Sequence, residues 1–282
     1  MTARRFSWAL LAVLVLVQIC YPLTTGTTRA RLTVATVVLG YLLSVGHALL
    51  TRGPRTAAAL VAVATGGGFA IEALGVATGF PFGSYDYSGQ LGPKLAGVPL
   101  IIPLAWTWMA WPAWLAAVRL TGGVDRATGA DGIGAGRTLR RIALATLGLA
   151  TWDLFLDPQM VAEGYWVWRD ATPALPGLPG IPVSNYLGWL LFAVLMMSAL
   201  RPLAGAAVAV TDSRDDPMAA LYLWTYFSSV LAHAVFLALP ASALWGAVGM
   251  SVTAVPLAVS LYRARRGDRD SRPRPTRVDV PA

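Results

Sequence analysis

The chain is poor in the residue types that most metal and redox sites require. Its 282 residues include one cysteine, Cys20, and two histidines, His47 and His233. A single cysteine excludes an internal disulfide, and it excludes zinc or iron–sulfur sites built on several cysteines. Two histidines are too few for the histidine-rich di-iron sites of membrane desaturases and hydroxylases. We therefore expect no metal and no redox cofactor, and we expect any added oxygen to come from water. No acid lies near His47 in the sequence, so we interpret it as a packing residue, and the role of His233 stays open.

Charged residues are also scarce. They make up 13% of the chain, of which 56% is hydrophobic, whereas soluble domains carry about 25% charged residues. This composition argues against a soluble fold. The net charge of +8 could suggest nucleic-acid binding, but seven of the 22 basic residues lie between Arg263 and Arg277, in a segment without apolar periodicity. We interpret residues 263–282 as a disordered, basic tail beside the membrane lipid, and we infer no nucleic-acid partner.

Long apolar windows dominate the rest of the chain. Each is long enough to cross about 30 Å of hydrocarbon. They predict an all-α fold, a polytopic membrane bundle of about eight transmembrane helices that forms a single domain over residues 1–262. Only Leu239, Pro240 and Ala241 separate the last two windows, so seven spans are an alternative. The windows lie near residues 6–23, 31–50, 57–78, 97–119, 139–157, 185–203, 218–239 and 241–262.

Basic residues are distributed unequally between the two ends of the predicted bundle. With eight spans and a cytoplasmic N-terminus, 18 of the 22 Lys and Arg residues lie on the inner side. The other 4 are Arg29, Arg31, Lys94 and Arg169. The positive-inside rule therefore predicts a multi-pass protein of the plasma membrane with both termini in the cytoplasm. The two longest outer connections, about 79–96 and 158–184, then share one face, while 120–138 is an inner polar linker.

Three acidic residues within the predicted spans suggest a functional site. An ionisable side chain costs about 2.5–3.5 kcal/mol at the centre of a membrane helix, so each one needs an explanation. Glu72 lies in the third window, and Asp153 and Asp157 lie one turn apart at the end of the fifth. All three are predicted near outward-facing helix C-termini, where the helix dipole and burial favour the neutral acid. We expect one acid to donate a proton beside another that stays ionised.

Packing roles are the alternative for these polar residues. Asp157 precedes a proline and could simply end its helix. Asp153 and Glu72 could be hydrogen-bonded packing acids. Asn185, at the start of the sixth window, could be a helix N-cap.

Aromatic residues are abundant in the fourth window and in the outer connections. Trp106, Trp108 and Trp111 are predicted near mid-membrane, where their rings could line a slot for a long conjugated ligand and stabilise a cation. For the aromatic residues of the connections, an interfacial belt is the alternative. The predicted ligand-contacting residues are Tyr85, Tyr87, Trp106, Trp166 and Asn185.

Three segments carry a resemblance to a known family. The first is Glu72 with Gly79-Phe80-Pro81-Phe82-Gly83-Ser84-Tyr85-Asp86-Tyr87 and Leu91-Gly92-Pro93-Lys94; the second is Trp152-Asp153-Leu154-Phe155-Leu156-Asp157-Pro158 with Gly164-Tyr165-Trp166-Val167-Trp168; the third is Gly180-Ile181-Pro182-Val183-Ser184-Asn185-Tyr186-Leu187-Gly188-Trp189. Together they resemble the membrane carotenoid hydratase family, the group of bisanhydrobacterioruberin hydratase and carotenoid 1,2-hydratase. The similarity runs through about residues 65–200.

The resemblance implies hydration of the terminal C1,C2 double bond of an acyclic carotenoid, without a cofactor. It implies carotenoid and water as reactants, and other carotenoid biosynthesis enzymes as candidate partners. Such a reaction needs an acid, a wall that tolerates a cation, and a base that holds water. From their positions we assign Asp153 as the leading proton donor and Asp157 or Glu72 as the carboxylate that orients water. A membrane lycopene cyclase-like enzyme and a non-catalytic carotenoid-binding or transport protein are the alternatives.

Overall fold

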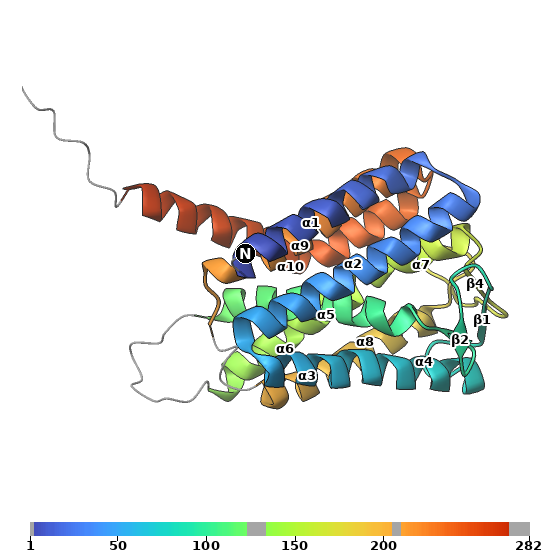
Figure 1. Cartoon of the computed structure of the whole chain (residues 1–282). Helices are drawn as coiled ribbons and strands as arrows, with labels where there is room; N and C mark the ends of the chain where they lie inside the picture. The colour runs from blue at the N-terminus through green and yellow to red at the C-terminus, as the bar shows by residue number, and fades with distance from the viewer. Residues whose placement is uncertain (1–2, 123–133, 205–209, 271–282) are drawn as a thin grey trace, which may run out of the picture.

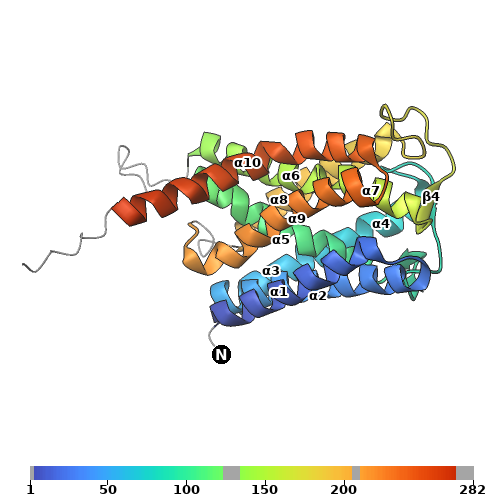
Figure 2. The ribbon, with the colours of Figure 1, turned by 90° about the horizontal axis from the view of Figure 1, so that it is seen from above.

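The computed structural model describes residues 3–122, 134–204 and 210–270, which form a bundle of helices packed side by side (Figures 1 and 2). The predicted all-α membrane bundle is confirmed, with eight helical segments in the described ranges. They are α1 (Ala3–Cys20); α2 (Gly26–Arg52); α3 (Pro54–Leu60), continued by a π-helical stretch into α4 (Gly67–Thr78); α5 (Ile102–Thr121); α6 (Ala135–Ala150) followed by α7 (Asp153–Ala162); α8 (Val183–Ala204); α9 (Asp216–Leu231), extended by a π-helical stretch to Phe236; and α10 (Pro240–Asp270).

Six of these segments are long and apolar enough to cross a membrane, and they identify a membrane protein. The other two are α5 and the α6–α7 pair. Helix α5 contacts α2, α4, α6, α9 and α10, and almost all of its side chains are buried. Because α5 is surrounded by protein rather than by lipid, its sequence can carry several tryptophans and prolines in place of aliphatic residues.

A proline inside α5 is accommodated by a neighbouring helix. Pro112 has no N–H group, so it leaves the carbonyl of Trp108 without its helical partner. The Ser44 hydroxyl of α2 donates a 2.9 Å hydrogen bond to that carbonyl. The packing of α2 on α5 therefore compensates for the break that the proline makes in the helical hydrogen bonding.

The predicted span 139–157 consists of two helices. Helix α6 ends at Ala150 and α7 begins at Asp153, so Asp153 lies in a first helical turn, where the dipole favours negative charge. The expectation that Asp153 lies near a helix C-terminus is therefore wrong. Asp157 does not end its helix either, because α7 continues through Pro158 to Ala162.

The last two predicted spans form a hairpin of separate helices. The α9 segment ends at Phe236, α10 begins at Pro240, and the two helices pack against each other, which favours eight spans over seven. The expectation of a disordered tail is wrong for residues 263–270, because α10 continues to Asp270. The rest of that tail, 271–282, and most of the linker 120–138 lie outside the described residues.

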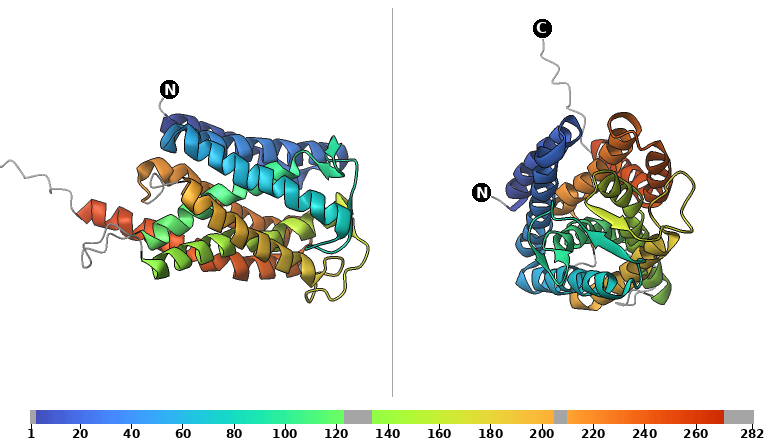
Figure 3. Two further views of the ribbon diagram at one scale, coloured as in Figure 1. Left: turned by 90° about the horizontal axis from the view of Figure 1, so that it is seen from below. Right: turned by 90° about the vertical axis from the view of Figure 1, so that its right-hand side faces the viewer.

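Both long outer connections lie at one end of the bundle, away from the N-terminus and from the end of α10, as predicted (Figure 1). Strand β1 (Tyr85–Tyr87) of the first connection pairs antiparallel with β4 (Trp166–Trp168) of the second. Strands β2 (Lys94–Leu95) and β3 (Val98–Pro99) form a short hairpin. Its turn residues, Ala96 and Gly97, have φ of 48° and 82°, as tight two-residue hairpins require. The end view in Figure 3 shows the strands crossing over the centre of the bundle.

Candidate functional site

Strands β1 and β4 form an aromatic cap over the end of the bundle. Tyr85 lies opposite Trp168, and Tyr87 lies opposite Trp166. Because side chains alternate along a strand, these four rings share the inner face. Trp166 and Trp168 are 6% and 7% exposed, whereas Val167 between them is 59% exposed. The two long connections predicted to share one face are therefore joined by one small sheet.

A salt bridge on the outer face ties the two strands of the cap together. Arg169 donates two hydrogen bonds, of 2.8 and 2.9 Å, to the carboxylate of Asp86. These bonds lower the pKa of Asp86 below its ordinary value. Both side chains are more than half exposed, so the pair adds little to stability and mainly sets the register of the strands.

Below the cap lies a cavity of about 1180 Å³, counted with the open space at its mouth. Its walls come from seven of the eight helical segments and from both outer connections. Seven of the eight predicted site residues line it, and Asp153 is the exception. The seven are Glu72, Tyr85, Tyr87, Trp106, Asp157, Trp166 and Asn185.

Asp153 and Asp157 form a buried pair that shares one amide. The Asn185 side-chain nitrogen donates a 2.8 Å hydrogen bond to Asp153 Oδ2, and the same nitrogen also donates to Asp157 Oδ2. Trp166 Nε1 donates to the other oxygen of Asp157 at 3.2 Å. Both aspartates are at most 3% exposed. The N-cap interpretation of Asn185 is wrong, because its side chain faces the pair and not the backbone of α8.

Glu72 accepts hydrogen bonds from three side chains. Tyr85 and Tyr87 donate to Oε2 at 2.6 and 2.8 Å, and Trp106 Nε1 donates to Oε1 at 2.9 Å. Burial and the adjacent Glu72 raise the pKa of both tyrosines, so their hydroxyls stay protonated. Three convergent donors match an ionised carboxylate, which can only accept. The rings of Tyr87 and Trp166 meet edge to face at 5.4 Å and join this cluster to the aspartate pair.

Two glycines of the third span make room for these donors. Gly68 and Gly75 flank Glu72 on one helical face. A Cβ on Gly68 would lie 3.0–3.1 Å from the Trp106 side chain, and one on Gly75 would lie 2.8 Å from the Tyr85 hydroxyl. The missing side chain at Gly68 therefore lets Trp106 approach the carboxylate of Glu72.

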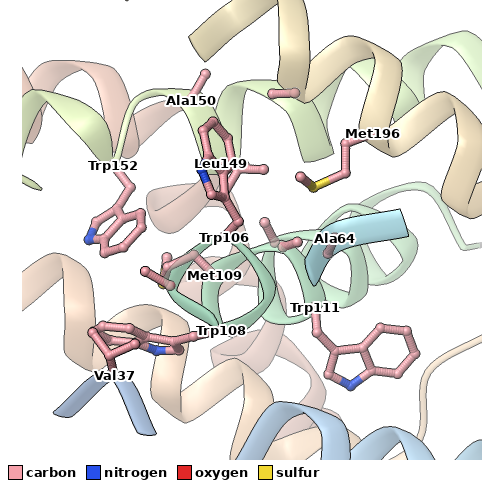
Figure 4. Close-up of a cluster of buried hydrophobic side chains, with 14 of the residues drawn as sticks. Val37, Ala64, Trp106, Trp108, Met109, Trp111, Leu149, Ala150, Trp152 and Met196 are labelled. Carbon is pink, nitrogen blue, oxygen red and sulfur yellow. The ribbon is translucent and has the colours of Figure 1, made fainter. Parts of the chain in front are cut away.

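Four indole rings form an aromatic wall in the cavity. Trp106 stacks on Trp189 at 3.7 Å, and Trp152 meets Trp189 and Trp108 edge to face at 6.1 and 5.3 Å. Figure 4 shows Trp106 and Trp108 leaving α5 in different directions, with Trp108 beside Val37. All four indoles line the cavity. The predicted site did not include Trp152 and Trp189, although each lies within one helical turn of a predicted polar residue.

Trp111, the third tryptophan predicted near mid-membrane, and the two histidines make other contacts. Trp111 does not line the cavity, and its Nε1 donates to His47 Nδ1 at 3.0 Å. His47 is fully buried, so the packing interpretation holds. Its Nε2 lies 3.6 Å from Oδ1 of Asp215, an acid that is distant in the sequence. His233 contacts Ser242 at 2.8 Å and the cavity residue Gln159 at 3.1 Å. Within the described ranges, no group of three or more His, Cys, Asp and Glu side chains has metal-binding geometry.

The sequence of this bundle is similar to those of known proteins. The model of a family described as carotenoid biosynthesis protein matches residues 32–256. Bisanhydrobacterioruberin hydratase of Haloarcula japonica is 34% identical over 164 residues, which cover 55% of this chain and 50% of that protein. The chain thus spans about half the length of this curated relative. No solved structure matches the chain.

Proposed function

Because the chain belongs to the carotenoid biosynthesis protein family, we propose that it is a membrane hydratase that adds water to the terminal C1,C2 double bond of an acyclic carotenoid. The observation that carries the proposal is a buried aspartate pair that reaches an aromatic cavity through Asp157, with the carboxylate of Glu72 on the same cavity. A curated relative is also named a hydratase. An acid, a cation-tolerant wall and an apolar chamber are what this reaction needs.

The first step is protonation of the alkene by the aspartate pair. Both carboxyls contact the same Asn185 nitrogen, and neither takes part in a salt bridge among the described residues. Two buried anions that close would repel each other, so the pair holds one proton. The proton passes to the less substituted carbon, and the π electrons form the new C–H bond. Asp157 faces the cavity, so the proton leaves through Asp157. Asp153, which its sequence position favoured as the donor, is the partner that shares the proton.

The cation formed by this step is stabilised from two sides. The carboxylate of Glu72 is held by three donors and supplies a fixed negative charge to the cavity. The indole faces of Trp106, Trp189 and Trp152 supply a wall that attracts a cation without reacting with it. These indoles are at most 5% exposed, and electrostatic interactions at such buried groups are stronger than they would be in solution.

Capture by water completes the reaction. A water oxygen forms the new C–O bond to the tertiary cation, and the proton that it loses returns to the aspartate pair. One water is consumed, the pair regains its starting state, and neither an oxidant nor a reductant takes part. The product is a tertiary alcohol at the end of the chain.

Expression of the full chain in a lycopene-producing bacterial host tests the proposal. Mass spectrometry of the extracted pigments should show products heavier than lycopene by one water for each hydrated end. In water enriched in heavy oxygen, the label should enter the product. A product of unchanged mass with cyclic ends would instead identify a cyclase, and unaltered lycopene that co-purifies with the protein would identify a binding or transport protein.

A further inference from the structure

The cavity wall also carries three buried polar groups that are not hydrogen-bonded to the carboxyl groups. They belong to Thr36 of α2, Trp108 of α5 and Thr225 of α9, which are 9%, 4% and 2% exposed. All three line the cavity. Among the described residues, Thr36 Oγ1, Trp108 Nε1 and Thr225 Oγ1 have no hydrogen-bond partner. Buried polar groups are as a rule hydrogen-bonded, and groups without a protein partner commonly bind ordered water.

The chemistry of this region selects a small neutral ligand. Each threonine hydroxyl can donate one hydrogen bond and accept up to two, and the indole N–H can donate one. The nearby lining residues Ser228 and Ser229 are neutral as well, so an ion would find no opposite charge here. Water both donates and accepts, and it needs two to four polar partners to be held in a protein interior. The three groups meet that requirement.

The polar region continues toward the surface along one face of α9. Thr225, Ser228, Ser229 and Ala232 all line the cavity, and their spacing of three and four residues places them on one helical face. Thr225 is buried, whereas Ser228, Ser229 and Ala232 are partly exposed. Gln18, near the end of α1, also lines the cavity and is partly exposed. This stripe of hydroxyl groups therefore leads from the partly exposed edge between α1 and α9 to the buried groups.

We propose that Thr36, Trp108 and Thr225 form a water-binding site that supplies the reacting water, which arrives along the Ser228–Ser229 face of α9. The inference rests on the proposed hydratase function, because it assigns the source of the nucleophile in that reaction. It also explains how water reaches a cavity whose other walls are mainly aromatic and aliphatic.

Radiolytic hydroxyl-radical footprinting of the purified full chain in detergent tests the site without using activity. Bound water generates radicals where it sits, so Trp108 should be oxidised strongly although it is buried. Trp114 is the internal control, because it is equally buried with an unpartnered Nε1 but does not line the cavity. Oxidation of Trp108 should fall several-fold in Thr36→Val and Thr225→Val. Equal oxidation of Trp108 and Trp114 in the unaltered protein would overturn the proposal.

Kinetics with the same variants test the role of the site. Thr36→Val and Thr225→Val should lower kcat several-fold and leave KM for the carotenoid unchanged. Thr253→Val is the matched control, because its buried hydroxyl donates to the Leu144 carbonyl and lies outside the cavity. A raised KM with unchanged kcat would overturn the assignment to water in favour of a hydroxyl group on the substrate. If the unaltered protein makes no hydrate but Trp108 is still oxidised strongly, the hydratase proposal fails while the water site stands.

Discussion

The side-chain nitrogen of Asn185 lies 2.8 Å from Asp153 Oδ2, and this hydrogen bond joins residues 32 positions apart in the sequence. It connects the first turn of α8 to the first turn of α7. The same nitrogen also bonds Asp157, so the two acids are held as one unit. Groups coupled in this way titrate together, and the loss of either one changes the behaviour of both.

We expect Asp153→Asn and Asp157→Asn each to abolish hydration while membrane insertion and folding are retained. Asparagine keeps the size and the hydrogen-bonding capacity of aspartate, but it cannot hold the proton that the pair delivers. Product per unit of membrane-inserted protein, measured in the lycopene-producing host, checks this expectation. Near-normal product from Asp157→Asn would rule out Asp157 as the residue that delivers the proton. Normal product from Asp153→Asn would show that Asp153 is a packing acid.

Glu72→Gln should lower turnover by about 10²-fold or more, the scale seen when one preorganised electrostatic contact to a transition state is removed. The tyrosine hydroxyls can rotate to accept from the new amide, so the melting temperature in detergent should change little. Glu163→Gln is the matched control, because Glu163 pairs with Arg29 and does not line the cavity. A parallel loss of melting temperature and activity in Glu72→Gln would instead indicate a packing role.

Reporter fusions should place both termini in the cytoplasm. The expectation rests on 18 of the 22 basic residues lying on the inner side and on both long aromatic connections lying at the opposite end of the bundle (Figure 1). A reporter inserted at the exposed Gly89 should be active only outside the cytoplasm. A C-terminal reporter that is active in the periplasm would contradict the even number of spans.

Hydration should continue in anaerobic membranes treated with a metal chelator. The proposed steps move one proton and one water and use neither oxygen nor a metal. Product formation with and without air, at equal protein level, is the measurement. If the product were lost without oxygen, an oxygenase would replace the hydratase as the best interpretation.

Gly40→Ala should destabilise the bundle by about 1–3 kcal/mol, the usual cost of overpacking a core. An alanine Cβ at this position would lie 2.6–2.8 Å from three ring atoms of Trp108, so the indole would have to shift. Gly46→Ala on the same helix is the control, because its nearest neighbour, Phe6, lies 3.4 Å away. Thermal unfolding in detergent compares the two. Equal melting temperatures would mean that the indole shifts without cost.

The sequence by itself determined the membrane class and the eight helical segments, and it singled out residues that the structure gathers around one cavity. Lipid requires about 20 apolar residues for each span and internally satisfied backbone groups, so hydrophobic windows are read directly from composition. Acids such as Glu72 and Asp157 are costly in such windows and therefore mark a functional region. Counting the predicted spans placed the two aromatic connections on the same side of the membrane.

Only the tertiary structure decided which groups meet. The local sequence pattern could not show the helix break before Asp153, the contact of Asn185 with both aspartates, or the stacking of Trp189 on Trp106. It also could not show that Asp157 reaches the cavity while Asp153, one turn away, does not. Hydropathy identifies which segments enter the membrane, but it hardly constrains how each helix is rotated about its axis. That rotation is set by side-chain packing between helices far apart in the sequence, and it decides which carboxyl faces the cavity.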